Sequence, residues 1–268
     1  MTQLAPVTVP PDVATLALAH DLGAHHDTFP PNKRLRIIIP FAILVVLFLL
    51  MTAVLAPAAG SNWLVLAVMF GFFVALFLAG LVYGLVTSPL VSARVRARKT
   101  YVFERGFVHV GRDGTEVCRW DAVRTVWQTI VQMVYNGIST GTNYAYRLQL
   151  ADGRLLKLNT MSTDMATFGP LIQHEVANAQ LPQAFQAIKA GQTLAFGPLA
   201  VSSGGIAVGG KAGLPWNEVK DVQLVQGAVR VMQQGKKVLA YGSVQASNVP
   251  NLGTFMALTR QLTQGRAS

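Results

Sequence analysis

The chain has 268 residues, of which 51% are hydrophobic and 13% are charged. Lys and Arg outnumber Asp and Glu by 22 to 12, which gives a formal net charge of +10. Seven of the basic residues lie in two short segments and the rest are spread thinly, which argues against a nucleic-acid-binding surface. Cys118 is the single cysteine, so an internal disulfide is excluded.

The first 32 residues are rich in proline and show little hydrophobic periodicity. We expect residues 1–32 to form a flexible cytoplasmic tail, with at most a short helix near Val13 to Leu22. His20, His25 and His26 lie in this segment. They do not predict a metal site, because no Cys and no carboxylate stands at ligand spacing beside them.

Two apolar runs, Ile37 to Pro57 and Trp63 to Val86, are the strongest signal in the chain. From the start of the first run to Ser92 there is no Asp, Glu, Lys, Arg or His. A helix needs about 20 residues to cross a bilayer, because each residue adds about 1.5 Å. The sequence therefore predicts a transmembrane helical hairpin over residues 33–93, with spans at about 37–57 and 63–87.

Basic residues precede the first span and follow the second, whereas the loop between the spans carries no charge. Lys and Arg in short flanking segments favour the cytoplasmic side. We therefore predict a multi-pass protein of the cell (inner) membrane with both termini in the cytoplasm. A basic residue near an anionic bilayer contributes about 1 kcal/mol. The candidate contacts with lipid head groups are Lys33, Arg34, Arg36, Arg94, Arg96, Arg98 and Lys99.

A cleaved signal peptide is the alternative for the first run, because Ala56-Pro57-Ala58 has the small-x-small pattern of a cleavage site. The run is longer than the usual apolar core of about 7–15 residues, a long segment precedes it, and a second span follows at once. We therefore expect the first run to remain as a span.

Small residues recur in the second span at Gly71, Ala75 and Ala79, with Gly80 and Gly84 beside them. Spacing by four places each set on one helix face, where another helix can approach closely. We expect the first span to be the partner, and self-association through the remaining stripe is a further hypothesis. The spans hold no ionisable residue, so we interpret the hairpin as an anchor and not as an ion pathway.

After Lys99 the sequence changes to short alternating segments separated by turn residues, which predict β-strands. Asp152-Gly153 is a strong hairpin signal. Apolar residues at spacings of three and four then predict a helix from Met165 to Ala179. We expect a first domain over residues 94–190, in which a Gly-, Ser-, Thr- and Asn-rich insert at 129–143 forms a protruding hairpin or a mobile loop.

The pattern then recurs, which predicts a tandem repeat with a second domain over residues 191–268. Gly205 to Val208 corresponds to Gly106 to Val110, and Trp216 to Val219 corresponds to Trp120 to Val123. A second helical pattern follows Pro250-Asn251. Each copy is a run of strands that ends in one helix, so we predict an α+β fold with two pleckstrin-homology-like modules, each an antiparallel sheet or barrel capped by a C-terminal helix.

The chain resembles an uncharacterised bacterial membrane-protein family that is recorded as a domain of unknown function. The resemblance covers about residues 100–262. Its motifs are Phe103-Glu104-Arg105-Gly106, Arg119-Trp120-Asp121-Ala122-Val123, Val126-Trp127-Gln128, Tyr135-Asn136-Gly137, Phe196-Gly197-Pro198-Leu199-Ala200-Val201 and Leu214-Pro215-Trp216-Asn217-Glu218-Val219. The resemblance implies tandem modules and assigns no catalytic residue.

No motif in the chain predicts an enzyme or a bound cofactor. Gly205 to Lys211 matches the start of a phosphate-binding loop, but Ala212 stands where Ser or Thr is required and no helix pattern follows. Cys118 has no evident activating base, His109 has apolar neighbours on a strand, and no paired carboxylates are visible. Trp120 and Trp216 are either ligand-stacking residues or core residues, and their recurrence in both copies favours the core.

A last candidate is a set of arginines in the first domain, which would hold an anionic head group if they converged at one end of the fold. The alternative is an ordinary solvated surface. These residues are Arg105, Arg112, Arg119, Arg124 and Arg154.

Together these features predict a non-enzymatic binding or scaffold protein at the cytoplasmic face of the membrane. Its partner would be another protein, a second copy of itself or anionic lipid, and not nucleic acid. The alternative functions are a membrane-anchored sensor or regulator of envelope state and, third, a membrane-bound enzyme.

Overall fold

The computed structural model describes residues 9–31, 35–58, 60, 63–135, 138–160, 162–235 and 240–264. The chain forms two compact units. The larger unit contains residues 1–29, 100–109 and 115–268, and the smaller one contains residues 30–99 and 110–114. The smaller unit holds the predicted helical hairpin, and the larger one holds the sheets.

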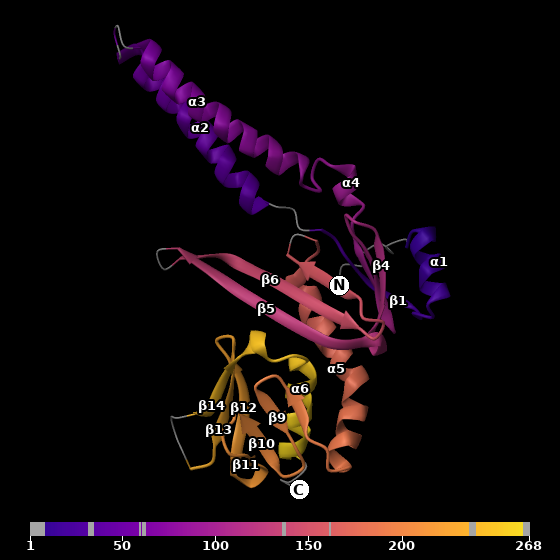
Figure 1. Ribbon diagram of the computed structural model, residues 1–268. Coiled ribbons are helices and arrows are strands. Elements are labelled where there is room, and N and C mark those ends of the chain that lie inside the picture. The colour runs from indigo at the N-terminus through magenta and orange to yellow at the C-terminus, as the bar shows by residue number, and fades with distance from the viewer. Residues whose placement is uncertain are drawn as a thin grey trace, which may run out of the picture. The chain divides into compact units, whose positions relative to one another are not determined.

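The smaller unit is built from two long apolar helices, α2 (Leu35–Ala58) and α3 (Trp63–Val86), which lie side by side (Figure 1). Aromatic rings pack between them, with Phe48 at 5.3 Å from Phe73 and 5.2 Å from Phe77 between ring centroids. The ring of Phe41 lies so close to Gly80 that a side chain there would overlap it. Helix α2 is therefore the partner of the Gly80 face of α3, as expected from the sequence.

A short helix, α4 (Ala93–Arg96), follows α3. Ser92 caps it, because its side chain accepts a hydrogen bond from Val95 N at 3.4 Å. The Arg96 guanidinium donates to the carbonyl oxygens of Pro89 and Leu90, both at 3.1 Å, and so closes the break between α3 and α4.

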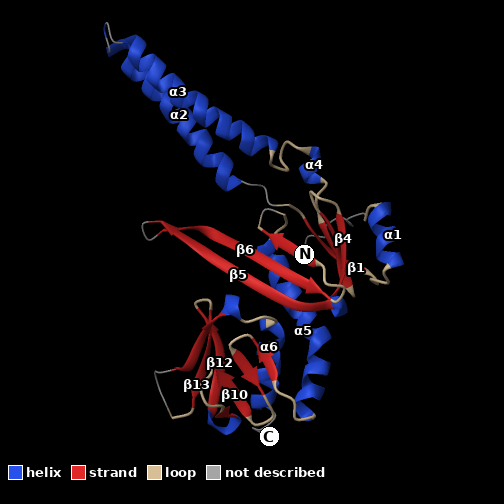
Figure 2. Ribbon diagram, in the orientation of Figure 1, coloured by secondary structure: helices blue, strands red, loops and turns tan. Residues whose placement is uncertain are grey.

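In the larger unit, the first module contains two antiparallel sheets, shown in red in Figure 2, with strand orders β1-β2-β3-β4 and β5-β6-β7. Its strands are β1 (His25–Phe29), β2 (Thr100–Phe103), β3 (Gly106–Val110), β4 (Thr115–Arg119), β5 (Val123–Tyr135), β6 (Ile138–Leu150) and β7 (Leu155–Asn159). A 3-10 turn, η2 (Trp120–Ala122), joins the sheets, and α5 (Met165–Lys189) follows β7.

The N-terminal segment differs from the flexible tail that we expected over residues 1–32. The short helix α1 (Pro11–Ala19) lies close to the one that the sequence allowed, whereas β1, which was not expected, pairs antiparallel with β2. The N–H groups of Glu104 and Arg105 donate to the carbonyl oxygens of Ala24 and Leu22, at 2.9 and 2.8 Å. The pairing of β1 with β2 joins strands that are separated by residues 30–99. No local sequence pattern predicts such a pairing, because the hydrogen bonds are made by backbone groups.

This pairing makes the helical hairpin an insertion within the first module. Phe29, the last residue of β1, lies opposite Thr100, the first residue of β2. The chain therefore leaves the module and returns to it at one point of one sheet.

The core of the first module is aromatic. Phe168 of α5 packs against Phe29 and Phe107, with ring centroids 5.1 and 5.3 Å apart, and Phe107 lies 5.1 Å from Trp120. All four side chains are buried. Burial of each is worth about 1.5–3 kcal/mol, so the N-terminal strand contributes to stability through Phe29.

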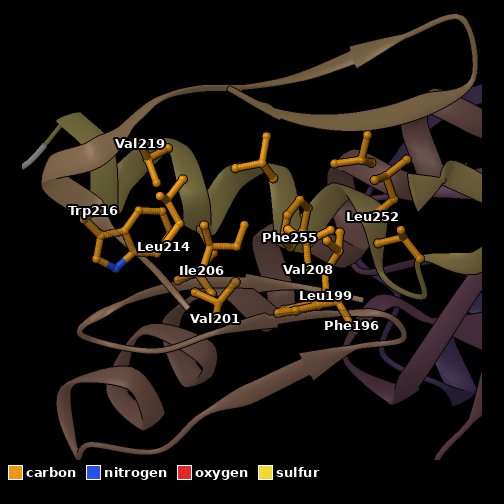
Figure 3. Close-up of a cluster of buried hydrophobic side chains, with 14 of the residues drawn as sticks. Phe196, Leu199, Val201, Ile206, Val208, Leu214, Trp216, Val219, Leu252 and Phe255 are labelled. Carbon is orange, nitrogen blue, oxygen red and sulfur yellow. The ribbon is translucent and has the colours of Figure 1, made fainter. Parts of the chain in front are cut away.

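The second module repeats this order of elements. Its strands are β8 (Leu194–Phe196), β9 (Leu199–Val201), β10 (Gly205–Val208), β11 (Leu214–Pro215), β12 (Val219–Val225), β13 (Ala228–Gln233) and β14 (Ala240–Gln245). The sheets have orders β11-β10-β9-β8 and β12-β13-β14, with η3 (Trp216–Glu218) between them. After β14 come η4 (Ala246–Asn248) and α6 (Leu252–Gln264). Side chains from both sheets surround Phe255 of α6 (Figure 3).

Helix α5 serves both modules. Its first half places Phe168, Ile172 and Val176 in the first core, whereas Phe185 and Ile188 from its second half pack in the second core. The helix therefore runs beyond the predicted end at Ala179.

The structure also tests the predicted barrel and the predicted insert at 129–143. Within the described residues, each module consists of two separate sheets and not of a closed barrel, so the barrel alternative is wrong. The predicted insert at 129–143 is a hairpin, formed by the distal parts of β5 and β6. Its tip, 136–137, lies outside the described residues.

Candidate functional site

The hairpin presents apolar side chains outwards. Both α2 and α3 contain stretches, Ile38–Leu55 and Trp63–Val86, that are long and apolar enough to cross a membrane. Large exposed side chains such as Val54, Val65 and Phe72 cover the helices. Exposed apolar patches of this extent mark a surface that contacts lipid or another protein.

The predicted head-group contacts fall into two groups. Lys33 and Arg34 lie outside the described residues, and Arg36 is in the first turn of α2 with its side chain outside the description. In the second group, Arg94 and Arg96 are exposed, and Arg98 and Lys99 are half-buried. The structure brings this second group together on and just after α4, although Arg96 also bonds backbone carbonyls.

Three of the candidate arginines in the first module have carboxylate partners. Arg105 bonds Asp21 at 2.6 Å, and Arg119 bonds Asp121 at 2.7 Å. Hydrogen bonding to Arg119 lowers the pKa of Asp121.

Arg154, the third arginine, bonds Asp152 at 2.6 Å and Glu116 at 3.0 Å. The backbone N–H and the side chain of Arg154 lower the pKa of Asp152. Three guanidinium groups therefore face four carboxylates, which leaves no excess positive charge to hold an anionic head group.

The remaining two arginines lie on other elements. Arg112 lies in the turn between β3 and β4, which belongs to the smaller unit, and Arg124 lies on β5. Of the two alternatives, the ion pairs of Arg105, Arg119 and Arg154 favour an ordinary solvated surface.

The titratable groups in the first core are held neutral by burial. Desolvation lowers the pKa of His109 to about 4, and its Nδ1 lies 2.8 Å from Thr100 Oγ1. Desolvation raises the pKa of Cys118 to about 12. A buried neutral thiol is a poor nucleophile. Both residues belong to the packed interior.

The two tryptophans are core residues. Trp120 and Trp216 are buried at the start of η2 and η3. Trp216 Nε1 donates to Ser202 O at 2.9 Å, whereas Trp120 Nε1 has no hydrogen-bond partner within the part of the chain that the structure describes. The core interpretation is confirmed for both side chains, with the N–H satisfied in the second module.

The glycine-rich segment Gly205 to Lys211 is not a phosphate-binding loop. Gly205–Val208 forms β10, and Gly209 and Gly210 turn the chain with φ of 57° and 75°. Lys211 Nζ donates to Tyr241 O at 2.8 Å. The segment leads to β11 and not to a helix, as the missing Ser or Thr indicated.

A junction between the two modules was not visible in the sequence. Asn251, with φ of 51°, bonds the edge of β5: its N–H donates to Val126 O at 2.8 Å, and its Oδ1 accepts from Val126 N at 2.7 Å. Its Nδ2 donates to Arg124 O at 2.9 Å, and Gln180 Nε2 donates to Val123 O at 2.9 Å. The sequence feature that could have drawn attention to this junction is Asn251, which follows Pro250 and directly precedes α6.

Beside this junction lies a groove of about 730 Å³ between β5 and the second module. One wall is the stretch Gln128–Gln132, with Thr142 and Tyr144 of β6. The other wall comprises Leu224, Gln226, Gly227, Gln245, Ala246 and Ser247. No charged residue is among those that line it.

Comparison with known proteins gives one match. A family model, described as a family of unknown function (DUF6585), matches residues 13–268. No curated protein and no solved structure matches the chain. The family model covers most of α1, the helical hairpin and both modules. The chain therefore belongs to this family of unknown function.

Proposed function

We propose that this protein is a non-enzymatic binding or scaffold protein of a bacterial inner membrane, which presents two pleckstrin-homology-like modules at the cytoplasmic face. Each described module has seven strands in two antiparallel sheets followed by one helix, which supports the pleckstrin-homology-like description. The bound partner is a protein or anionic lipid.

The observation that carries this proposal is the insertion of the apolar hairpin between β1 and β2. Because Phe29 lies opposite Thr100, the chain enters and leaves the hairpin at one point. If α2 and α3 cross the bilayer, the N-terminal segment and both modules must share one side. The basic residues Arg94 to Lys99 favour the cytoplasm as that side.

The ion pairs of the surface arginines in the first module and the burial of Cys118 and His109 support a non-enzymatic function. Acids compensate Arg105, Arg119 and Arg154, and the two core groups are neutral. Positively charged residues after α3 support contact with anionic head groups, at about 1 kcal/mol for each residue near the surface.

The test is residue-by-residue labelling of the full chain in intact cells. In a Cys118→Ala background, single cysteines replace Ala19, Ser61 or Gln234, and a membrane-impermeant maleimide is added before or after permeabilisation. We expect Ser61→Cys to react in intact cells, and the other two variants to react only after permeabilisation.

The three sites provide their own controls. Labelling of positions 19 and 234 on opposite sides would contradict the β1–β2 pairing. Extraction of the chain from membranes by alkaline carbonate would contradict the anchor itself, since spanning helices stay with the bilayer.

A further inference from the structure

The edge of β5 is only partly used by the junction with the second module. Val126 directs its N–H and C=O away from β6, because both bond Asn251. In an antiparallel pair, peptide groups that point outwards recur at every second residue. The β5–β6 register is regular from Thr125 to Met133, so Gln128 and Ile130 point the same way as Val126.

The other side of the β5–β6 ribbon confirms this direction. Tyr144 lies opposite Ile130, and its N–H and C=O bond Thr160, away from β5. The N–H and C=O of Ile130 therefore face the free edge, and neither has a hydrogen-bond partner within the described ranges of the chain. The open edge starts where the contact with Asn251 ends.

An open strand edge with no protecting charge invites pairing with another strand. Natural edges are usually blocked by Lys, Pro, a bulge or a covering element. Here no Asp, Glu, Lys, Arg or His occurs from Gln128 to Tyr146. Ile130 is 50% exposed and Leu224, across the groove, is 48% exposed. The groove thus combines outward-facing backbone groups with uncharged walls, in which Ile130 and Leu224 are exposed apolar side chains.

We propose that this groove binds an extended, uncharged segment of a partner protein, which adds as a strand to β5 beside Gln128 and Ile130. The proposal rests on the binding function proposed above and names the class of partner. Strand addition continues the backbone bonding that Asn251 begins at Val126, and alternate side chains of the added strand meet the walls. A charged residue in the groove would lose its hydration without finding a counter-ion.

The geometry favours a peptide over lipid. Donors and acceptors spaced at a strand repeat match a peptide backbone, whereas an acyl chain leaves them unpaired. The volume of about 730 Å³ lies within the range of about 300–1,000 Å³ that is usual for ligand sites.

The experiment uses the full chain in nanodiscs of phosphatidylcholine and a phage-displayed library of random 12-residue peptides. We expect the selected peptides to be uncharged, with apolar residues at alternate positions. A synthetic peptide of the selected sequence should slow amide hydrogen exchange at Ile130 by at least tenfold.

Two substitutions locate the binding. Ile130→Pro removes the outward N–H without touching the bonds to β6, and we expect it to weaken peptide binding at least tenfold. Leu155→Pro is the matched control: Leu155 is 49% exposed on β7, and its N–H points away from β6. This control should leave binding within twofold of the parent value.

Charge provides a second matched pair. Leu224→Lys should weaken binding of the uncharged peptide at least tenfold, whereas Leu155→Lys should not change it. Equal binding by Ile130→Pro and the parent would overturn the proposal, as would a failure to select any peptide that protects Ile130.

A photo-crosslinking residue at position 130, compared with one at 155, separates the remaining outcomes in cells. Adducts with a second copy or with lipid would overturn the peptide proposal in favour of those occupants. If position 130 gives no adduct while the labelling of positions 19, 61 and 234 is as expected, the groove proposal fails and the membrane-anchored arrangement stands.

Discussion

In the first module β5 and β6 each have 13 residues, whereas the corresponding strands of the second module, β12 and β13, have seven and six. The first module also takes its first strand from before the helical hairpin, while the second module is continuous in sequence. The order of elements is the same in both. The additions to the first module therefore mark where this protein differs from a plain sheet-and-helix module.

The two modules also differ in how their buried polar groups are hydrogen-bonded. The second module satisfies Trp216 through Ser202, whereas the first buries His109 and leaves Trp120 Nε1 without a partner in the described structure. The second module has short strands, no insertion and a hydrogen-bonded tryptophan. The long strands, the hairpin insertion and the buried histidine are all in the first.

The largest expected effect tests whether β1 belongs to the first core. Phe29→Ala should lower the free energy of unfolding of the first module by about 3–5 kcal/mol, because it removes a buried ring packed on Phe168. Phe196→Ala, at a ring that packs on Phe255 in the second module, should cost a similar amount. Denaturant unfolding in detergent measures both.

Leu18 supplies the control for this comparison. It is 82% exposed on α1, so Leu18→Ala should change stability by less than about 0.5 kcal/mol. An equally small effect of Phe29→Ala would show that β1 is dispensable and that the tail predicted from sequence describes the segment better.

The next effect is acid sensitivity confined to the first module. Burial lowers the pKa of His109 from 6.5 to about 4, so the unfolded chain binds a proton at a higher pH than the folded one. The stability from neutral His109 is present above pH 6.5 and is lost as the pH falls towards 4. The full loss is on the order of 3 kcal/mol.

The matched variant is His109→Val, since the sequence correspondence places Val208 at this position of the second module. It should flatten the change in unfolding midpoint between pH 6.5 and 4, whatever its effect at pH 7.5. An unchanged pH profile in this variant would assign the acid sensitivity to other groups.

The smallest effect compares the two tryptophans. Trp216→Phe removes the hydrogen bond to Ser202, whereas Trp120→Phe has no such bond to remove. We expect the first substitution to cost about 1 kcal/mol more than the second in thermal unfolding, after similar losses of volume. Equal costs would mean that Trp120 Nε1 is hydrogen-bonded in solution.

Features set by local pattern could be predicted from the sequence. The apolar runs predicted both long helices with ends close to those of α2 and α3, because a charge-free run longer than about 20 residues has few alternatives. The missing Ser or Thr after Lys211 ruled out a phosphate-binding loop. Recurring Trp120 and Trp216 indicated the shared place of η2 and η3.

The candidate site was less accessible to this kind of reasoning. In the sequence, three arginines of the first module stand out as cations: Arg105, Arg119 and Arg154. The net charge of the surface around them also depends on the acids that folding brings beside them, which are Asp21, Asp121, Asp152 and Glu116. The edge of β5 has no motif either, because its outward-facing groups belong to the backbone of Gln128 and Ile130.

The sequence alone determined the apolar hairpin, its basic flanks and most strands and helices of the two modules, since these depend on composition and periodicity within short windows. Tertiary structure decided that β1 pairs with β2, that α5 enters both cores and that Asn251 bonds the edge of β5. These contacts join residues far apart in the chain through backbone groups that every residue type carries, so no local pattern encodes them.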